Sequence, residues 1–319
     1  MTRLSLVATL KFKFMKISRL LPFLVVALFA TFSFSSCNRF EGSQEIPSYI
    51  YVDKFLLTTN YAIEGSASHN ITDVWVYVDD DLRGCYELPA TVPLLDRGKH
   101  KISLYPGIKL NGISKTRVVY PFYKPYIVED FELEEKRVDT LHPSVTYYSA
   151  DEGSTITFRY IEDFERTVSL ENDEESDTTI IRTERDDAGN WNDAFNNSHY
   201  SGYVWLGETP EGDTIDYFCL LSEEYKDLPN QGNNVMLEID YKCDEVFQVG
   251  LQYKISGVVK YPLYNVNPSQ TWNKIYLNLG PRITELQEAE WFKFYITGST
   301  APGSESEFYF DNIKLIYRD

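Results

Sequence analysis

Residues 233–241 read NNVMLEIDY, and the pattern of this stretch decides the fold class. It is predicted to be a β-strand, because every second residue is apolar, which is the period of a strand with one buried face. Similar short runs, separated by Gly, Pro, Asn and Asp, recur after Cys37, and no window of 11–18 residues there sustains a helical period. The sequence therefore predicts an all-β protein. The inward positions of the opening stretch are Val235, Leu237, Ile239 and Tyr241.

The composition limits the class of protein. The chain has 319 residues, of which 43% are hydrophobic and 15% aromatic, so it can bury a sizeable core and is not a disordered polymer. This length favours two domains. Acidic residues outnumber basic ones by 48 to 30, a formal net charge of −18. This balance disfavours nucleic acid as a partner, because no basic surface is available to displace phosphate counterions.

Residues 1–36 are predicted to be a signal peptide. Five basic residues and no acidic residue precede Cys37, and they come before an apolar stretch at residues 20–34. As a helix, this stretch would be about 22 Å long, which is shorter than the roughly 30 Å of a bilayer core. The pattern therefore indicates the n-region and h-region of a signal rather than a membrane-spanning helix. Translation can start at Met1 or at Met15, because either start leaves a complete signal.

The end of this segment reads Phe-Ser-Ser-Cys at residues 34–37 and resembles the lipobox of bacterial lipoproteins. The resemblance implies cleavage before Cys37 and attachment of diacylglycerol, which carries palmitate-type acyl chains, to its sulfur. Acylated Cys37 would anchor the protein in a lipid bilayer, and residues 37–45 would form a tether. Phe34 stands where the family usually has Leu. The alternative is conventional cleavage, with Cys37 as an incidental thiol.

The first predicted domain covers residues 46–148. Residues 72–78 place three valines on one face of a strand, and Asp79-Asp80-Asp81 then turns the chain. The proline-marked run at residues 88–94 and the turn at residues 97–100 resemble PEGA-type and related immunoglobulin-like sandwiches, which are usually envelope stalks or spacers. The resemblance covers about 50 residues. An aromatic segment in this domain fits either an interface with the second domain or a partner-binding surface: Tyr105, Tyr120, Phe122, Tyr123 and Tyr126.

The second predicted domain covers residues 152–319. Four segments of it resemble, in the right order, the motifs of jelly-roll carbohydrate-binding modules. The resemblance implies an antiparallel β-jelly-roll sandwich, and sugar binding in some members, although a shared sandwich does not establish a shared ligand. The segments are IEDFE at 161–165, HYSG at 199–202, TWNKIYL at 271–277 and FYFDNIKL at 308–315.

The same resemblance implies a structural calcium site. In that family, the acid of the opening strand and the acid of the closing strand often bind one calcium, and here those residues are Glu165 and Asp311. Asp311 is in phase with Ile313 and Leu315, so an inward carboxylate would need a partner or a cation. Carboxylate oxygens suit calcium. The alternatives are that a bulge turns Asp311 outward or that Lys or Arg pairs with it.

A glycan site requires exposed flat aromatic rings among polar side chains, because a sugar ring stacks on a π system while its hydroxyl groups form hydrogen bonds. One stretch, at residues 189–207, interleaves aromatic residues with Asn and Asp. Each of these rings could equally be buried, and Trp205, between Val204 and Leu206, could belong to the core. The candidate ligand-binding residues are Trp191, Tyr200, Tyr203 and Trp205.

The remaining reactive residues give little sign of catalysis. The four histidines have no ligand-like spacing, and neither hydrolase, phosphate-loop nor dinucleotide motifs occur, so no enzyme activity is predicted. The acidic residues 171–177 are predicted to be a solvated hairpin turn. Cys219 and Cys243 could form a disulfide or remain buried free thiols, and free thiols are the favoured interpretation.

Together these features resemble a Bacteroidota-type cell-envelope lipoprotein. We expect a non-catalytic, lipid-anchored protein, and the outer membrane is the favoured location. The folded domains could lie on either the periplasmic or the surface side of this membrane. Its jelly-roll domain is expected to bind a glycan or another surface ligand. The alternative is a structural component of an envelope protein complex, with no small-molecule site.

Overall fold

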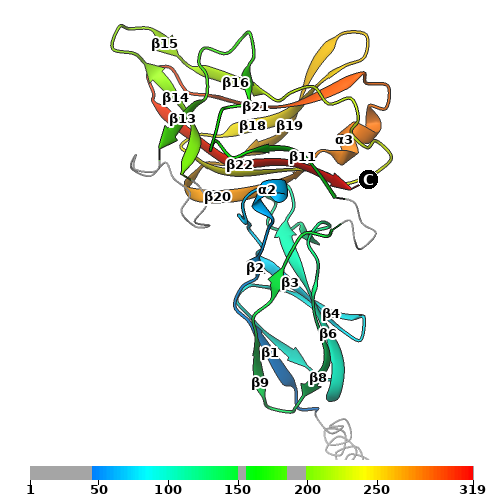
Figure 1. The fold of residues 1–319 in the computed structure, drawn as a ribbon. Helices are drawn as coiled ribbons and strands as arrows, with labels where there is room; N and C mark the ends of the chain where they lie inside the picture. The colour runs from blue at the N-terminus through cyan, green and yellow to red at the C-terminus, as the bar shows by residue number, and fades with distance from the viewer. Residues whose placement is uncertain (1–44, 150–155, 185–198, 319) are drawn as a thin grey trace, which may run out of the picture. The chain divides into compact units, whose positions relative to one another are not determined.

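The computed structural model describes residues 45–149, 156–184 and 199–318. The predicted signal peptide, Cys37 and the tether up to residue 44 lie outside these ranges. Within them, the compact unit Pro47–Asp319 consists of β-strands with two short helices, α2 (Tyr61–Glu64) and α3 (Gly280–Glu285), which confirms the predicted all-β class (Figure 1). Neither of these helices is long and apolar enough to cross a bilayer.

The first sandwich is made of two sheets. One has the strand order β5-β1-β9, and the other has the order β4-β3-β6-β7, with β8 also paired to β6. A short parallel pair, β2 with β10, completes it. The strands are β1 (Ser48–Val52), β2 (Leu56–Leu57), β3 (Asp73–Val78), β4 (Asp81–Glu87), β5 (Ala90–Leu94), β6 (Gly98–Lys109), β7 (Arg117–Val119), β8 (Tyr126–Leu133), β9 (Val138–Leu141) and β10 (Ser144–Val145).

Alternation along β3 explains how this sandwich forms. Val74, Val76 and Val78 are completely buried in its core, as their period of two predicts. Asp79 and Asp80 follow with positive φ angles of 50° and 70°, the backbone of a tight hairpin turn into β4. The expected immunoglobulin-like sandwich and its acidic turn are therefore present.

The second sandwich also has two sheets, which we name the back sheet and the front sheet. The back sheet has the order β13-β14-β22-β17-β20, with β11 on β22 and β15 on β14, and the front sheet has the order β12-β16-β21-β18-β19. Their strands are β11 (Ile156–Glu162), β12 (Glu171–Asn172), β13 (Ile181–Glu184), β14 (Tyr200–Glu208), β15 (Thr214–Ile215), β16 (Tyr217–Leu221), β17 (Val235–Cys243), β18 (Phe247–Lys254), β19 (Val258–Val266), β20 (Ser269–Asn278), β21 (Trp291–Ser299) and β22 (Ser306–Arg318).

The last strand, β22, organises this sandwich. It pairs antiparallel with the opening strand β11 and, on its other edge, with β17, so the two ends of the predicted jelly roll lie side by side. The inward positions of β17 and β22 form one core between the two sheets. The antiparallel jelly-roll sandwich is therefore confirmed.

A β-bulge in β22 changes the expected position of Asp311. Phe308, Phe310, Ile313 and Leu315 all belong to the core between the sheets, so the alternation shifts by one residue between Phe310 and Ile313. At this point the register with β17 shifts, and Asn312 has a positive φ of 47°. Asp311 is consequently out of phase with Ile313, although its side chain is still fully buried.

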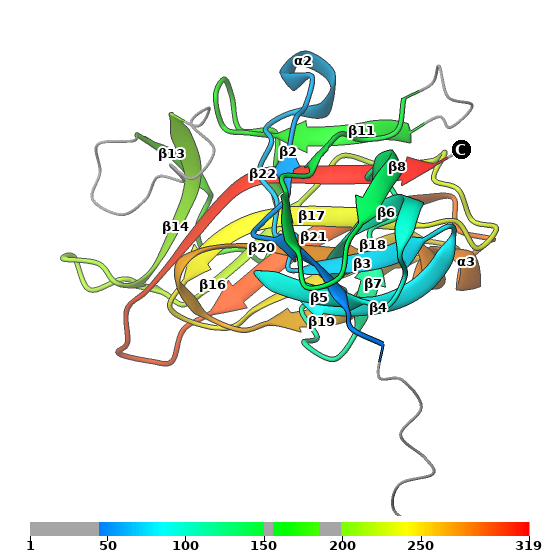
Figure 2. The same ribbon diagram turned by 90° about the horizontal axis from the view of Figure 1, so that it is seen from below.

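The first sandwich covers one half of the outer face of the back sheet. Met236 of β17, Tyr276 of β20 and Ile316 of β22 belong to the apolar cluster of the first sandwich. The ring of Tyr120 lies 4.9 Å from that of Tyr276. Seen from below, strands of the first sandwich lie across β17 and β20 (Figure 2). The buried Tyr120, Phe122 and Tyr123 confirm the interface interpretation for this part of the aromatic segment.

Charged groups are buried in the same interface. Lys274 Nζ lies 3.1 Å from both Glu238 Oε2 and Asp240 Oδ1. Tyr120 donates a hydrogen bond of 2.5 Å to Glu238, and the Ser68 hydroxyl donates one to Asp240. These bonds join loops of the first sandwich to strands of the second, because Tyr120 and Ser68 belong to the first and the charged groups to the second.

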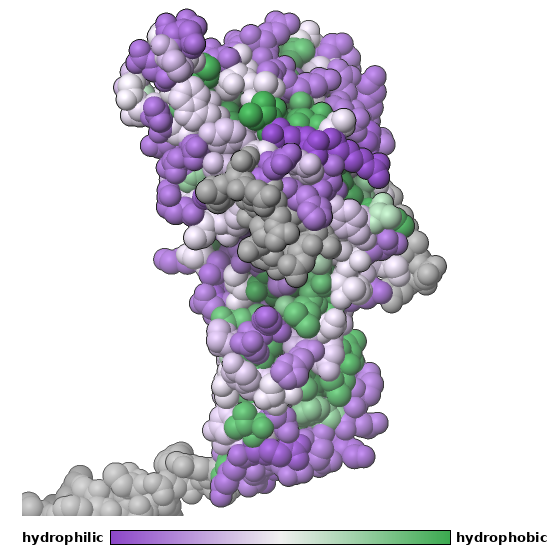
Figure 3. Space-filling model, turned by 60° about the vertical axis from the view of Figure 1, so that its left-hand side comes forward, coloured by the Kyte–Doolittle hydropathy of each residue, from purple (hydrophilic) through white to green (hydrophobic). Residues whose placement is uncertain are grey.

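Hydrophilic residues dominate the exposed face shown in Figure 3, and hydrophobic residues form small groups between them. This distribution agrees with the strongly acidic composition of the chain.

Candidate functional site

The outer face of the front sheet forms a trough. Lys260 of β19 and Asp173, which follows β12, lie at opposite edges of this five-stranded sheet, yet Lys260 Nζ is 2.7 Å from Asp173 Oδ1. In a flat sheet, the outer two of five strands would be about 19 Å apart. The two side chains and their contact span only about 12 Å, so the sheet must curve and bring its edges together over its outer face.

One end of the trough is open. A cavity of about 410 Å³ lies there, in the size range of small-molecule sites. Strand register places Thr297 of β21 opposite Gln248 of β18, and Gln248 opposite Asn265 of β19, so these polar side chains share the outer face. The polar residues that line the cavity are Tyr217, Glu245, Gln248, Asn265, Thr297 and Ser299.

The lining of this open end is suited to ligand hydroxyl groups. Gln248 Nε2 donates a 2.9 Å hydrogen bond to Asn265 Oδ1, which holds the two amides side by side. Each amide retains further donor or acceptor capacity for a ligand. Thr297 is fixed by a 2.6 Å bond to the carbonyl oxygen of Phe218, and Tyr217 presents a half-buried ring beside it. Glu245 is the single ionisable carboxylate among the six polar residues that line the cavity.

The other end of the trough is filled. Cys219, Leu221 and Tyr295 form a small buried cluster on the outer face of the front sheet, separate from the main core. The Tyr295 ring lies directly on Gly250, where a Cβ atom would come within 2.3 Å of Tyr295 Cζ. Burial raises the pKa of Tyr295 to about 12. The Lys260–Asp173 ion pair passes across this cluster.

The ion pair is fully charged at neutral pH. Burial alone would raise the pKa of Asp173, but the hydrogen bond from Lys260 and the one from the Glu175 amide together hold it below its ordinary value. Burial alone would lower the pKa of Lys260, but the bond to Asp173 and nearby negative charges raise it. The acidic residues 171–177 are therefore not only a solvated turn, because Asp173 is packed against the front sheet.

The free half of the back sheet carries a second candidate surface, the aromatic platform. It contains the predicted residues Tyr203 and Trp205 on β14, next to Tyr309 on β22, with 4.9 Å between the rings of Tyr203 and Tyr309. The hydroxyl groups of both tyrosines donate to the Glu307 carboxylate, at 2.9 and 3.0 Å. Trp272, which the sequence analysis did not nominate, lies 6.5 Å from Tyr309.

Trp205 is not a core residue, because its neighbours Val204 and Leu206 take the inward positions and its own side chain is half-buried. Its indole ring lies flat on Gly207, where a Cβ atom would be 2.4 Å from Trp205 Cζ2. A ring that lies flat on the backbone presents its other face outward, which is the orientation that sugar stacking needs.

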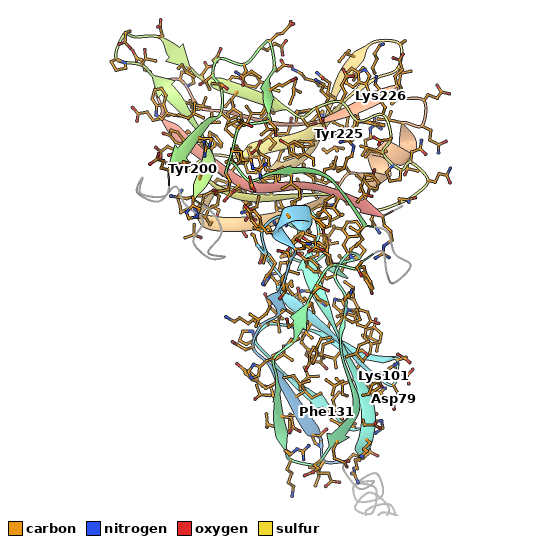
Figure 4. The ribbon with its side chains drawn as sticks, in the orientation of Figure 1. Asp79, Lys101, Phe131, Tyr200, Tyr225 and Lys226 are labelled. Carbon is orange, nitrogen blue, oxygen red and sulfur yellow. The ribbon has the colours of Figure 1, made fainter. Side chains whose placement is uncertain are left out.

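The other two candidate aromatic residues do not join the platform. Tyr200 lies on β14 near β13 (Figure 4), is half-buried against the main core, and has the Arg182 guanidinium 3.7 Å above its ring. It therefore stabilises the fold locally. Trp191 lies outside the described residues.

The predicted calcium residues have other contacts. Glu165 accepts hydrogen bonds from the backbone amides of His199 and Tyr200, and Asp311 accepts one from Asn312. Across the described ranges, His, Cys, Asp and Glu side chains do not gather in threes as a metal-ligand set. A calcium site at Glu165 and Asp311 stays a prediction.

The cysteines are free thiols in the described part of the chain. Cys219 lies on the outer face of the front sheet and Cys243 in the core, and neither forms a disulfide. Burial raises the pKa of Cys243 to about 11, so this thiol stays protonated at neutral pH. The favoured interpretation of the two residues is confirmed.

No protein-family model matches the chain, and no curated protein matches it either. Among solved structures, it is similar to a xylan-binding domain from CBM 22, with 17% identity and a TM-score of 0.33 over 50% of this chain and 93% of that one. A family 11 carbohydrate-binding module from Clostridium thermocellum, in complex with a β-1,3-1,4-mixed-linked tetrasaccharide, is 15% identical, with a TM-score of 0.31 over 48% of this chain and 92% of that one.

The enzymatically active domain of tailspike protein 4 of bacteriophage CBA120 is also similar, with 14% identity and a TM-score of 0.34 over 49% of this chain and 20% of that one. The similarity is distant in all three cases.

Proposed function

We propose that the protein binds a neutral glycan in the open end of the trough, without catalysis. The observation that carries this proposal is a cavity of about 410 Å³ whose wall combines a half-buried tyrosine with amide and hydroxyl side chains. Such a wall offers both donors and acceptors to sugar hydroxyl groups. The ligand is proposed to be neutral because the lining includes the acid Glu245 and the chain as a whole has a net charge of −18, which repels acidic polysaccharides.

The aromatic platform is the competing site for the same function. Trp205 supports it, because its indole ring lies flat and half-exposed next to Glu307, whose carboxylate could accept hydrogen bonds from a ligand. The two surfaces lie on opposite sheets of one sandwich, so a variant in one leaves the side chains of the other in place.

The test is retention of the purified protein on a panel of neutral polysaccharides, followed by titration calorimetry with the best ligand. Gln248→Ala should weaken binding about three- to tenfold, since a neutral hydrogen bond contributes about 0.5–1.5 kcal/mol. Trp205→Ala serves as the matched control on the opposite sheet and should leave the affinity unchanged. If Trp205→Ala weakens binding and Gln248→Ala does not, the site is the aromatic platform. If the protein is retained on none of the polysaccharides, the proposed function is refuted.

The alternative function, a structural part of an envelope complex, has less support. The aromatic segment of the first sandwich was its candidate contact surface, but Tyr120, Phe122 and Tyr123 are buried against the second sandwich. A pull-down of partner proteins that survives Gln248→Ala and Trp205→Ala, with no glycan retained, would favour it.

We also propose that acylated Cys37 anchors the protein in a bacterial envelope membrane, the outer membrane for preference. Support comes from the basic and apolar signal-like segment and from the Ser-Ser-Cys that ends it. Metabolic labelling with an alkyne-tagged palmitate should mark the protein. The label should be lost in Cys37→Ser and kept in Cys85→Ser. Equal labelling of both variants would refute the anchor.

A further inference from the structure

The Lys260–Asp173 ion pair divides the trough across its width. Strand register gives the order of residues along the trough. Thr297, Gln248 and Asn265 form one row, in the open cavity. Tyr295 and Gly250 lie in the next row, and Lys260 lies one row further, from which its side chain reaches back over Tyr295 to Asp173. The pair therefore runs obliquely across the trough beside the cavity, because Asp173 is bonded to Cys219, the strand partner of Thr297, whereas Lys260 lies two rows away from Thr297.

The ion pair, which we call the barrier, is held at both ends by hydrogen-bonded backbone. On one side, Lys260 belongs to the regular part of β19 and faces Gln252 of β18. On the other side, the Asp173 amide donates a 2.9 Å bond to the carbonyl oxygen of Cys219. The Ser176 hydroxyl accepts a 3.0 Å bond from the Cys219 amide, so the acidic loop is fastened to β16. The Asp173 side chain is only 11% exposed, which shows how closely it is packed.

The direction of the trough makes the barrier important. The two edge strands of the front sheet approach each other, so the sheet is curved in the direction perpendicular to its strands. The trough that this curvature forms runs parallel to the strands. A contact from edge to edge then lies across the path of any chain that enters from the open end. Continuing along the trough would require such a chain to break an ion pair whose Asp173 side chain is 11% exposed and whose Lys260 side chain is 28% exposed. Breaking such a partly buried pair costs more than breaking a fully exposed one.

We propose that the trough binds the end of a glycan chain and not an internal segment of it. This inference rests on the proposed function. The terminal sugar occupies the cavity between Tyr217, Gln248 and Asn265, and the Lys260–Asp173 ion pair prevents the chain from continuing along the trough beyond it.

The test uses one neutral polysaccharide that the full chain retains, supplied intact and as fragments of the same material at equal mass. A tenfold reduction in chain length gives tenfold more chain ends per gram, so the binding capacity per gram should rise about tenfold. The affinity for short oligosaccharides should stop rising once the cavity is filled. If the binding capacity per gram is the same for intact polysaccharide and for its fragments, the inference is overturned.

Two variants test the barrier from opposite edges of the sheet. Lys260→Ala and Asp173→Ala should each open the trough, so that intact polysaccharide binds with a capacity per gram close to that of the fragments. Lys254→Ala is the matched control, because Lys254 forms an exposed ion pair with Glu290 in the same sheet, and it should keep the preference for ends. Thermal unfolding of each variant establishes that it is folded.

The outcomes separate the two proposals. If Gln248→Ala weakens binding as expected but intact and fragmented polysaccharide bind equally per gram, the site stands and the end preference is refuted. If folded Lys260→Ala and Asp173→Ala both keep the preference for ends, the ion pair is not its cause and the inference is also refuted. If neither form of the polysaccharide binds, both proposals fail.

Discussion

The interface between the two sandwiches makes a quantitative prediction about Lys274. Its ammonium group is the charged partner of both Glu238 and Asp240, at 3.1 Å from each, and its side chain is 3% exposed. Burial alone would lower the pKa of Lys274, but the two carboxylates raise it, so the group is charged at neutral pH. Lys274→Met removes the charge and preserves much of the side-chain volume.

The expected loss of stability depends on the contacts that Glu238 and Asp240 keep after Lys274 is replaced. Two buried carboxylates lose their shared cation, and removing one partner of a buried pair typically costs about 3–5 kcal/mol. Tyr120 and Tyr147 still donate to Glu238, and Asn312 still donates to Asp240, so the loss should stay within that range. At a denaturant slope of about 3 kcal/mol per molar urea, a loss of about 4 kcal/mol moves the unfolding midpoint down by about 1.3 M.

The assay is equilibrium unfolding in urea at pH 7, followed by tryptophan fluorescence. Lys254→Met is the matched control, since its 2.6 Å pair with Glu290 is exposed and should contribute at most about 1 kcal/mol. Combining Lys274→Met with Glu238→Gln should destabilise less than the sum of the two single changes, because the pair is lost together. A midpoint for Lys274→Met equal to that of the control would refute the buried-charge account.

Three further predictions concern other parts of the molecule. Burial and the charge of Lys274 lower the pKa of His69 to about 4 in the folded chain, whereas the unfolded chain binds this proton near pH 6.5. The free energy of unfolding should therefore fall as the pH drops from 6.5 to 4. In urea titrations at a series of pH values, His69→Gln should reduce this fall. Gly250→Ala should destabilise by about 1–3 kcal/mol in thermal unfolding, because its Cβ would meet Tyr295, whereas Gly257→Ala, which has open space, should cost much less. If Glu165 and Asp311 hold calcium, the thermal midpoint of the native chain should rise with added calcium and fall with a chelator, and that of Asp311→Asn should do neither; a native midpoint that responds to neither addition contradicts the site.

Local alternation in the sequence predicted much of the fold. The valines of β3 and the inward row of β17 occupy the core because a period of two leaves them one buried face. The sandwich arrangement, in which the first and last strands of the second sandwich pair, followed instead from the resemblance to jelly-roll modules. Trp205 could be nominated because it interrupts an apolar pair in a stretch rich in Asn. Asp311 was assigned to the wrong phase, since one inserted residue shifts every later position. Phe308 and Phe310, in the opposite phase, were the signal of this bulge.

The trough could not be predicted in the same way. Gln248, Asn265 and Thr297 lie on three strands, and each is an ordinary outward polar residue in its own stretch of sequence. Asp173 and Lys260 meet only because the front sheet curves, and no local pattern encodes that curvature. Glu238 and Asp240 likewise occupy the outward phase of β17, where alternation alone predicts water, but the first sandwich covers them.

The charged joint between the sandwiches also has a mechanical consequence. A swivel at this joint would pull Glu238 and Asp240 away from Tyr120 and Ser68 while these groups are still shielded from water, so bending is costly from its first few degrees. Force applied to the second sandwich would therefore reach β1 with little bending at the joint between the two sandwiches.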